Sequence, residues 1–135
     1  MHPSSPIATR HLEQCKQDLD VFGYCFIKDA IDSDLLPLVR QRLVEQAAGE
    51  RQAGCAWMDG GGANQRVWML VNKGKEFRQL LKHATVNTLM KYLLGKGYLV
   101  SSLTANIAGP GGDPMELHPD QGYVKMFQEK INTIN

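Results

Sequence analysis

The chain has 135 residues, with fifteen Lys and Arg against fourteen Asp and Glu, so its formal net charge is +1. Nucleic-acid binders gather Lys and Arg against phosphates, but here the basic residues are mixed with acidic ones and form no patch. The same balance argues against a charge-driven role at a membrane surface. With 43% hydrophobic and 21% charged residues, the composition is that of a folded globular protein, and one domain over 1–135 is expected.

The three cysteines include no C-x-x-C pair, which favours reduced thiols in a cytoplasmic protein over a disulfide framework. The N-terminus has no basic stretch leading into an apolar one, so we expect no secretory signal. No apolar run is long enough to span a bilayer.

The spacing of apolar residues and the positions of helix- and strand-breaking residues predict an alternation of helices and short strands in the first half of the chain. Apolar residues at spacings of three and four, strand-rich composition and breaker residues carry these predictions. The elements expected up to residue 65 are a helix capped by Thr9 and stopped by Gly23, a strand over 24–27, a helix that begins at Asp32 or Ser33 and fades near Gly49, and a loop over 49–65.

The predicted loop is centred on three consecutive glycines, Gly60 to Gly62. A phosphate-binding P-loop would need Gly-Lys-Ser/Thr opening a helix, and none follows. A flexible surface loop is therefore expected, which could also serve as a lid over a site.

The second half continues with one strongly periodic helix and one long strand. The expected elements are a strand over 66–71, a turn over 72–74, a short helix over 77–82, a helix over 86–94 that Gly95 ends, and a strand over 98–107. One side of the last strand is mainly apolar, and the other carries Ser102, Thr104 and Asn106. Such a polar row needs partners, which either a ligand cavity or solvent can supply.

His118 and Asp120 follow a dense cluster of glycine and proline. In extended structure residues i and i+2 point to the same face, so the imidazole and the carboxylate can converge on one metal ion. Two histidines and one carboxylate form the ligand set that suits non-haem Fe(II) oxygenases. The pair alone is also compatible with a surface His beside a turn-forming Asp.

The sequence around this pair, Leu99-Val-Ser-Ser-Leu-Thr-Ala-Asn-Ile-Ala-Gly-Pro-Gly-Gly-Asp-Pro-Met-Glu-Leu-His118-Pro-Asp120-Gln-Gly-Tyr123, closely resembles the phytanoyl-CoA dioxygenase family of Fe(II)- and 2-oxoglutarate-dependent oxygenases. The segments Gly23-Tyr-Cys-Phe-Ile-Lys-Asp-Ala-Ile31 and Arg66-Val-Trp-Met-Leu-Val-Asn-Lys-Gly74 also look like family segments. The resemblance covers about residues 9 to 124, and residues 102 to 123 are its most specific part.

The fold that the resemblance implies is a double-stranded β-helix, a cupin-like jelly roll with flanking helices, of α+β or mainly β class. Residues 1–97 would supply the flanking helices and short strands. Residues 98–124 would supply the first core strands with the His-x-Asp site, and residues 125–135 form a tail that departs from the family pattern.

The resemblance further implies Fe(II) held by His118, Asp120 and a later histidine, with 2-oxoglutarate as cosubstrate and molecular oxygen as oxidant. Arg66 is the candidate contact to the cosubstrate, with Thr104 and Asn106 as further candidates; a surface salt bridge is the alternative role for Arg66. The implied reaction is oxidative decarboxylation of 2-oxoglutarate coupled to hydroxylation of a small organic or acyl substrate.

The sequence departs from the family pattern after Asp120. Only fifteen residues follow, none is a histidine, and the late arginine that grips the cosubstrate is absent. We therefore expect the N-terminal part of such a domain, weakly active or inactive alone, whose jelly roll is incomplete and whose open sheet edges could drive self-association.

Two other function classes remain open at this stage. A non-catalytic remnant of the family could bind a small molecule or regulate a partner without turnover. A helical interaction module, in which His-x-Asp is accidental, would contain no β-sheet around residues 98–107.

Overall fold

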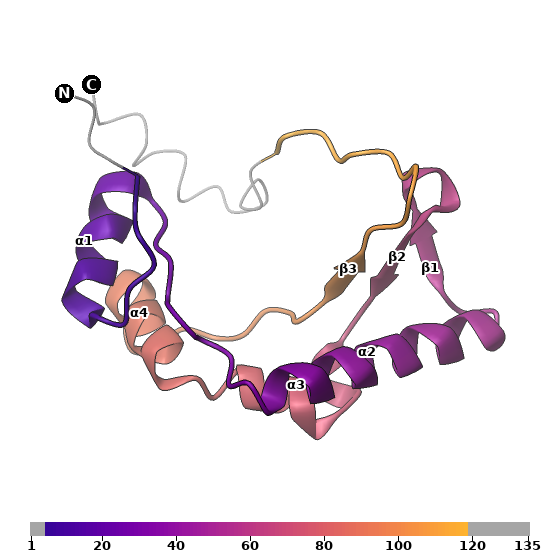
Figure 1. The fold of residues 1–135 in the computed structure, drawn as a ribbon, viewed down its shortest axis with the longest axis horizontal. Coiled ribbons are helices and arrows are strands. Elements are labelled where there is room, and N and C mark those ends of the chain that lie inside the picture. Colours follow the sequence, from indigo (N-terminus) through magenta and orange to yellow (C-terminus); the bar gives the residue numbers. More distant parts are fainter. Residues whose placement is uncertain (1–4, 119–135) are drawn as a thin grey trace.

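The computed structural model describes residues 5–118. Figure 1 shows α1 and α4 packed together at one end of the molecule, with α2, α3 and the sheet at the other. The elements in chain order are α1 (Leu12–Phe22), α2 (Leu35–Gln52), β1 (Trp57–Asp59), the 3-10 turn η1 (Gly60–Gly62), β2 (Asn64–Val67), the 3-10 turn η2 (Leu70–Asn72), α3 (Lys75–Leu80), α4 (Ala84–Leu94) and β3 (Ala105–Ile107).

Helix α1 confirms the periodicity of its sequence, and it ends at Gly23 as predicted. Gly23 adopts a left-handed φ of 77°, and its N–H donates to Leu19 O at 3.0 Å. The N-terminal prediction was wrong by two residues, because His11 and not Thr9 is the residue before the helix. Thr9 instead accepts a hydrogen bond from His11 N–H through Oγ1 at 3.0 Å.

The strand predicted over 24–27 is reduced to a single parallel bridge between Thr9 and Ile27. Thr9 N–H donates to Phe26 O at 3.0 Å, and Lys28 N–H donates to Thr9 O at 2.8 Å. The prediction was wrong beyond this bridge, since β-propensity forms a ladder only where a partner strand lies alongside.

Helix α2 begins where Leu35 and Leu36 donate their N–H groups to the Asp32 carbonyl, both at 3.0 Å. It continues through Gly49 to Gln52, so the predicted end near Gly49 was wrong. A glycine inside a helix costs only about 1 kcal/mol relative to alanine. Ala47 and Glu50 on either side of it are buried, and their packing offsets that cost.

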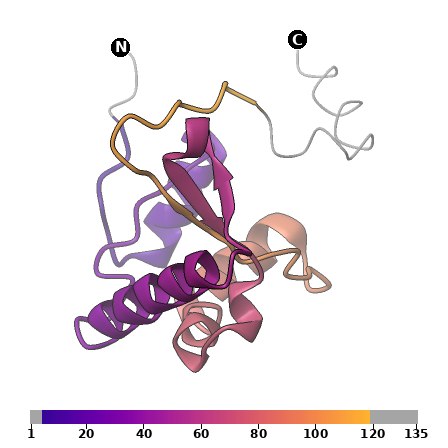
Figure 2. The same ribbon diagram turned by 90° about the vertical axis from the view of Figure 1, so that its right-hand side faces the viewer.

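A three-stranded antiparallel sheet in the order β1-β2-β3 faces α2 (Figure 2). Strand β1 lies inside the segment predicted as a loop, so that prediction was wrong. Gly60, Gly61 and Gly62 have φ angles of 58°, 71° and 89°, and they form the turn that lets β1 return as β2. At Gly60 a Cβ would lie 2.2 Å from Asn64 Nδ2, so a side chain there would displace the Asn64 amide.

The other two predicted strands are shorter in the structure. Strand β2 ends at Val67, because Met69 adopts a left-handed φ of 54° that leads into η2. Only Ala105–Ile107 of the predicted strand 98–107 pairs with β2. Leu103 O accepts one hydrogen bond from Leu70 N–H at 2.9 Å, but residues 98–104 have no ladder partner in the described chain. The pairing of β3 with β2 contradicts the purely helical module.

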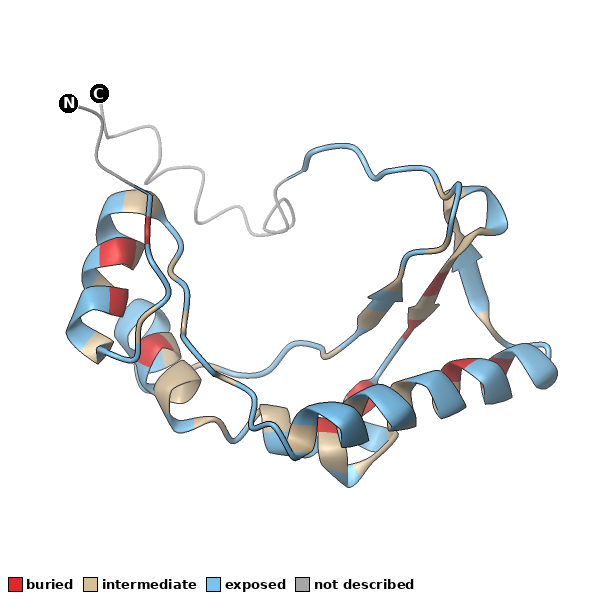
Figure 3. Ribbon diagram, in the orientation of Figure 1, coloured by how far each residue is buried: buried red, intermediate tan, exposed pale blue. Residues whose placement is uncertain are grey.

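The hydrophobic core lies between α2 and the sheet and is closed by α3 and η2 (Figure 3). Phe77 is 1% exposed and Val67 is fully buried. Gln65 is also fully buried, and its Nε2 donates to the Ala47 carbonyl at 3.0 Å, which joins β2 to the α2 backbone. The residues that complete the core are Ala47, Leu70, Val39, Leu43, Leu103, Ala105 and Ile107.

Helix α4 starts at His83, whose Nδ1 accepts a hydrogen bond from Val86 N–H at 3.2 Å. This hydrogen bond from the backbone to the ring caps the start of α4. Leu89 is buried, whereas Leu93 and Leu94 are 46% and 56% exposed, so only part of the apolar stripe is covered. No helix within residues 5–118 combines the length and apolar character needed to cross a membrane.

Glu50 and Lys73 form an ion pair at the edge of the core, with Nζ 2.5 Å from Oε1. Burial by itself would raise the pKa of Glu50. Hydrogen bonds from Lys73 and Gln46, together with the charge of Lys73, outweigh burial and lower that pKa below its ordinary value. The pair therefore stabilises the fold when Glu50 is ionised.

Replacing Lys73 by Met should lower the free energy of unfolding by about 1–3 kcal/mol at pH 7, because a buried carboxylate loses its charged partner. A lowered native pKa gives stability that is present above the unfolded pKa and is lost as the pH falls through the native value. The difference between wild type and K73M in urea titrations should therefore shrink at acidic pH. Exposed Lys75 supplies the control, and K75M should match wild type at both pH values. A difference that persists unchanged into acid would contradict the role of Glu50.

Candidate functional site

Alternation along β2 places Arg66 on the sheet face opposite the core. Its Nε donates to Asn106 Oδ1 at 3.0 Å, across the β2–β3 pair in which these two residues are direct partners. Its Nη2 lies 3.3 Å from Met115 Sδ and 3.3 Å from Asp59 Oδ2. The Arg66 guanidinium thus joins both neighbouring strands to the segment that leads to His118.

A cavity of about 650 Å³ opens at this face. Arg66 and Asn106 contribute its nitrogen donors, Asp59 and Asp113 its carboxylates, and the glycine-rich turns its backbone walls. The Nη1 group of Arg66 makes no hydrogen bond within residues 5–118. The lining consists of Asp59, Gly60, Gly61, Asn64, Arg66, Asn106, Ala108, Gly109, Gly112, Asp113, Pro114 and Met115.

Asn64 holds the loop that closes one side of this cavity. Its Oδ1 accepts from Gly109 N–H at 3.1 Å, and its Nδ2 donates to Asp113 O at 3.3 Å. A Cβ at Gly112 would lie 2.2 Å from Asn64 Oδ1, and one at Gly109 would lie 2.2 Å from Ala63 O. The glycines after β3 are therefore needed for close approach to the β1–β2 hairpin.

The five residues predicted for the site fall into three groups. Arg66 and Asn106 are in direct contact and line the cavity. Thr104 is exposed, lies just before β3 and is absent from the cavity lining. His118 is exposed, and Asp120 lies outside the described residues.

His118 Nδ1 lies 2.7 Å from Glu116 O. A carbonyl oxygen only accepts, so in this contact Nδ1 carries the hydrogen. A carbonyl acceptor behind one ring nitrogen is the arrangement that orients metal-binding histidines. The chemistry of His118 therefore fits a metal ligand, although residues 5–118 contain no cluster of three His, Cys, Asp or Glu side chains that could hold a metal.

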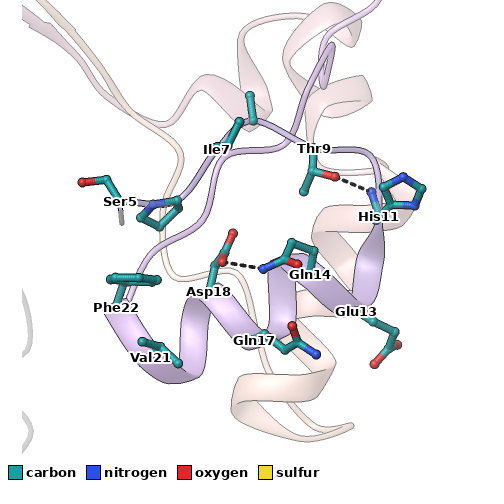
Figure 4. Close-up of a pocket in the computed structure, with 12 residues that line it drawn as sticks. Ser5, Ile7, Thr9, His11, Glu13, Gln14, Gln17, Asp18, Val21 and Phe22 are labelled. Carbon is teal, nitrogen blue, oxygen red and sulfur yellow. Dashed lines mark hydrogen bonds between the residues drawn. The ribbon is translucent and has the colours of Figure 1, made fainter. Parts of the chain in front are cut away.

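A larger cavity, of about 840 Å³, lies between residues 5–9 and α1 (Figure 4). Asp18 is 5% exposed there, and its Oδ1 accepts from Gln14 Nε2 at 2.9 Å, while Oδ2 has no hydrogen-bond partner among residues 5–118. The charged groups of the lining are Glu13 and Asp18, which would repel a carboxylate ligand. None of the four predicted site residues that the structure describes lines it, so the smaller cavity at Arg66 is the candidate site.

Sequence reasoning missed the contributions of Asp59, Asn64 and Met115. Asn64 follows the three glycines directly, which is a hairpin signal that could have been recognised. Met115 had no signal of its own, because its contact with Arg66 joins residues 49 positions apart.

Comparison with known proteins gives one informative relative. The chain is 34% identical over 120 residues to a protein of Aspergillus fumigatus named Dioxygenase af480. The chain is therefore similar in sequence to a protein that is named as a dioxygenase. The match takes in 86% of this chain but only 39% of the relative's length. No family model matches the chain, and no solved structure matches it.

Replacing Asn64 by Ala should loosen the loop over 109–114, because Gly109 N–H and Asp113 O lose their side-chain partners. We expect a loss of about 1 kcal/mol of stability and much faster hydrogen exchange at the Gly109 amide. An exposed amide elsewhere serves as the control: Asn72→Ala should leave the Gly109 exchange rate unchanged. Equal exchange at Gly109 in wild type and N64A would contradict this role.

Proposed function

We propose that the chain carries part of an Fe(II)- and 2-oxoglutarate-dependent dioxygenase site of the phytanoyl-CoA dioxygenase type, which oxidises a small organic or acyl substrate. One observation carries the proposal: Arg66 contacts both Asn106 and Met115, and so links the candidate cosubstrate residues to the segment that leads to His118. The relative named as a dioxygenase supports the reaction class.

Arg66 would bind a carboxylate of 2-oxoglutarate. A guanidinium offers parallel N–H donors to a carboxylate, and the bond from Arg66 Nε to Asn106 fixes the plane of that fork. Asp59 already neutralises part of the charge at 3.3 Å. A ligand carboxylate would therefore share Arg66 with Asp59, and the free Nη1 edge is where it would add.

His118 and Asp120 would hold the iron, and iron in this setting supplies the activation of molecular oxygen coupled to decarboxylation of 2-oxoglutarate to succinate and carbon dioxide. The contribution of the chain is positioning. Glu116 O fixes the tautomer of His118, and the glycine and proline residues between β3 and Met115 bring that segment back over Arg66.

A binding function without turnover is the second candidate, because residues 5–118 contain no three-ligand metal cluster. The measurement that separates the two is succinate formation from 2-oxoglutarate by the purified chain with Fe(II) under air. Succinate that is lost in H118A supports catalysis, and 2-oxoglutarate binding without succinate supports the binding function.

The variants R66Q and D59N test the cosubstrate role of Arg66 as a matched pair. Both break the same ion pair, but only R66Q removes the guanidinium. Calorimetric titration with 2-oxoglutarate in the presence of Mn(II) should give at least tenfold weaker binding for R66Q. D59N should bind as tightly as wild type or more tightly, because it removes a competing carboxylate. Equal losses in both variants would assign Arg66 to a structural salt bridge instead.

Binding of Mn(II), observed by electron paramagnetic resonance, tests the metal ligands. H118A and D120A should each abolish most of the bound signal, since each removes one of the two proposed ligands. His11 is exposed and its side chain caps nothing, so H11A is the control and should bind like wild type. Metal binding that survives both H118A and D120A would remove the proposed site.

A further inference from the structure

The two tryptophans of the chain, Trp57 and Trp68, lie on the same sheet face as Arg66. Trp57 on β1 is the direct cross-strand partner of Arg66, and Trp68 follows Arg66 by two positions. Their rings meet edge to face, with centroids 6.2 Å apart and an interplanar angle of 86°. The Arg66 guanidinium carbon lies 5.1 Å from the centre of the Trp68 ring.

Both rings are fixed by contacts yet remain uncovered. Trp57 is 57% exposed and Trp68 is 41% exposed, whereas Val67 on the opposite face of β2 is fully buried. Ligand pockets combine apolar and aromatic walls with a few placed polar groups. Neither indole lines the cavity itself, but both adjoin Arg66, which does: Trp57 is its cross-strand partner, and its guanidinium lies over the Trp68 ring.

The charges beside the rings select the ligand. Arg66 already occupies a face of Trp68, so an organic cation would meet a like charge there. Asp59, which pairs with Arg66 and also lines the cavity, would repel an anionic group that reaches past the guanidinium. An uncharged apolar skeleton is the chemistry that both rings accept without a charge conflict.

We propose that Trp57 and Trp68 form the wall that binds the uncharged aliphatic or alicyclic skeleton of the substrate, next to the cosubstrate at Arg66. This inference rests on the proposed function, which places the cosubstrate at Arg66. The two tryptophans are then specificity-determining residues, and the preferred substrates carry no cationic group near the skeleton that packs on the rings.

The 135-residue chain offers a direct test, because these two tryptophans are its only indole fluorophores. Cyclooctanol and its ammonium analogue cyclooctylamine serve as probes with matched skeletons. Titration with cyclooctanol should shift the tryptophan emission to shorter wavelength with a saturable curve. Cyclooctylamine should bind at least fivefold more weakly, and R66Q should remove most of that difference.

Substitutions of the two tryptophans test whether they bind the probe. W57S and W68S should each weaken cyclooctanol binding at least fivefold, as reported by the remaining tryptophan and by calorimetry, while W57F and W68F retain most of it. Leu99 is 89% exposed, and L99S is the control that should bind like wild type. If cyclooctanol does not bind, or if W57S and W68S leave its binding unchanged, the proposed role of the two tryptophans is wrong.

The same protein distinguishes failure of the wall from failure of the proposed function. If 2-oxoglutarate does not bind but cyclooctanol binds at the two tryptophans, the proposed function fails and the apolar site stands. If 2-oxoglutarate binds through Arg66 but cyclooctanol binding does not depend on either tryptophan, the proposed role of the tryptophans is wrong and the proposed function stands.

Discussion

Gln65 and Val67 are fully buried on the side of β2 that faces α2, and the Gln65 amide is bonded to the Ala47 carbonyl at 3.0 Å. Because side chains alternate along a strand, this buried pair forces Arg66 to the opposite face. A slip of one residue would bury the guanidinium and expose the core, so the register of β2 is strongly specified. The contacts of Arg66 with Asn106, Asp59 and Met115 depend on that register.

The buried amide of Gln65 also carries a cost. Its Oε1 has no hydrogen-bond partner in the described part of the chain, and an unsatisfied buried polar atom lowers stability by about 1–3 kcal/mol. An apolar residue at this position would avoid the cost but lose the bond to α2. The Gln65 amide therefore lowers stability but fixes the position of β2 against α2. That position determines where Arg66 lies on the opposite face of the sheet.

The helices could be predicted from sequence because their signals are local. The periodicity of α1 and its stop at Gly23 are decided within a few residues. The strands were predicted less well, since pairing is decided by distant segments. Strand β1 was missed, and residues 98–104 have no partner strand within residues 5–118, although their composition is typical of a strand.

The same contrast between local and long-range determinants holds for the residues of the site. Sequence could nominate Arg66 and Asn106 separately, but their bond comes from the pairing of β2 with β3, forty residues apart. Thr104 shares the alternation of Asn106 but lies before the paired strand, and it does not line the cavity that the described residues form. Asp120, nominated from its spacing to His118, lies outside the described residues and stays a prediction.

The central claim is that the His118 segment and the Arg66–Asn106 pair belong to one site. Paramagnetic broadening by Mn(II), read from side-chain resonances with 2-oxoglutarate present, tests it most directly. The account predicts strong broadening of the Arg66 Nε–H and Asn106 amide signals in wild type, loss of that effect in H118A, and little effect on the Asn87 amide of α4. Broadening that spares Arg66 and Asn106, or that is equal at Asn87, would contradict it.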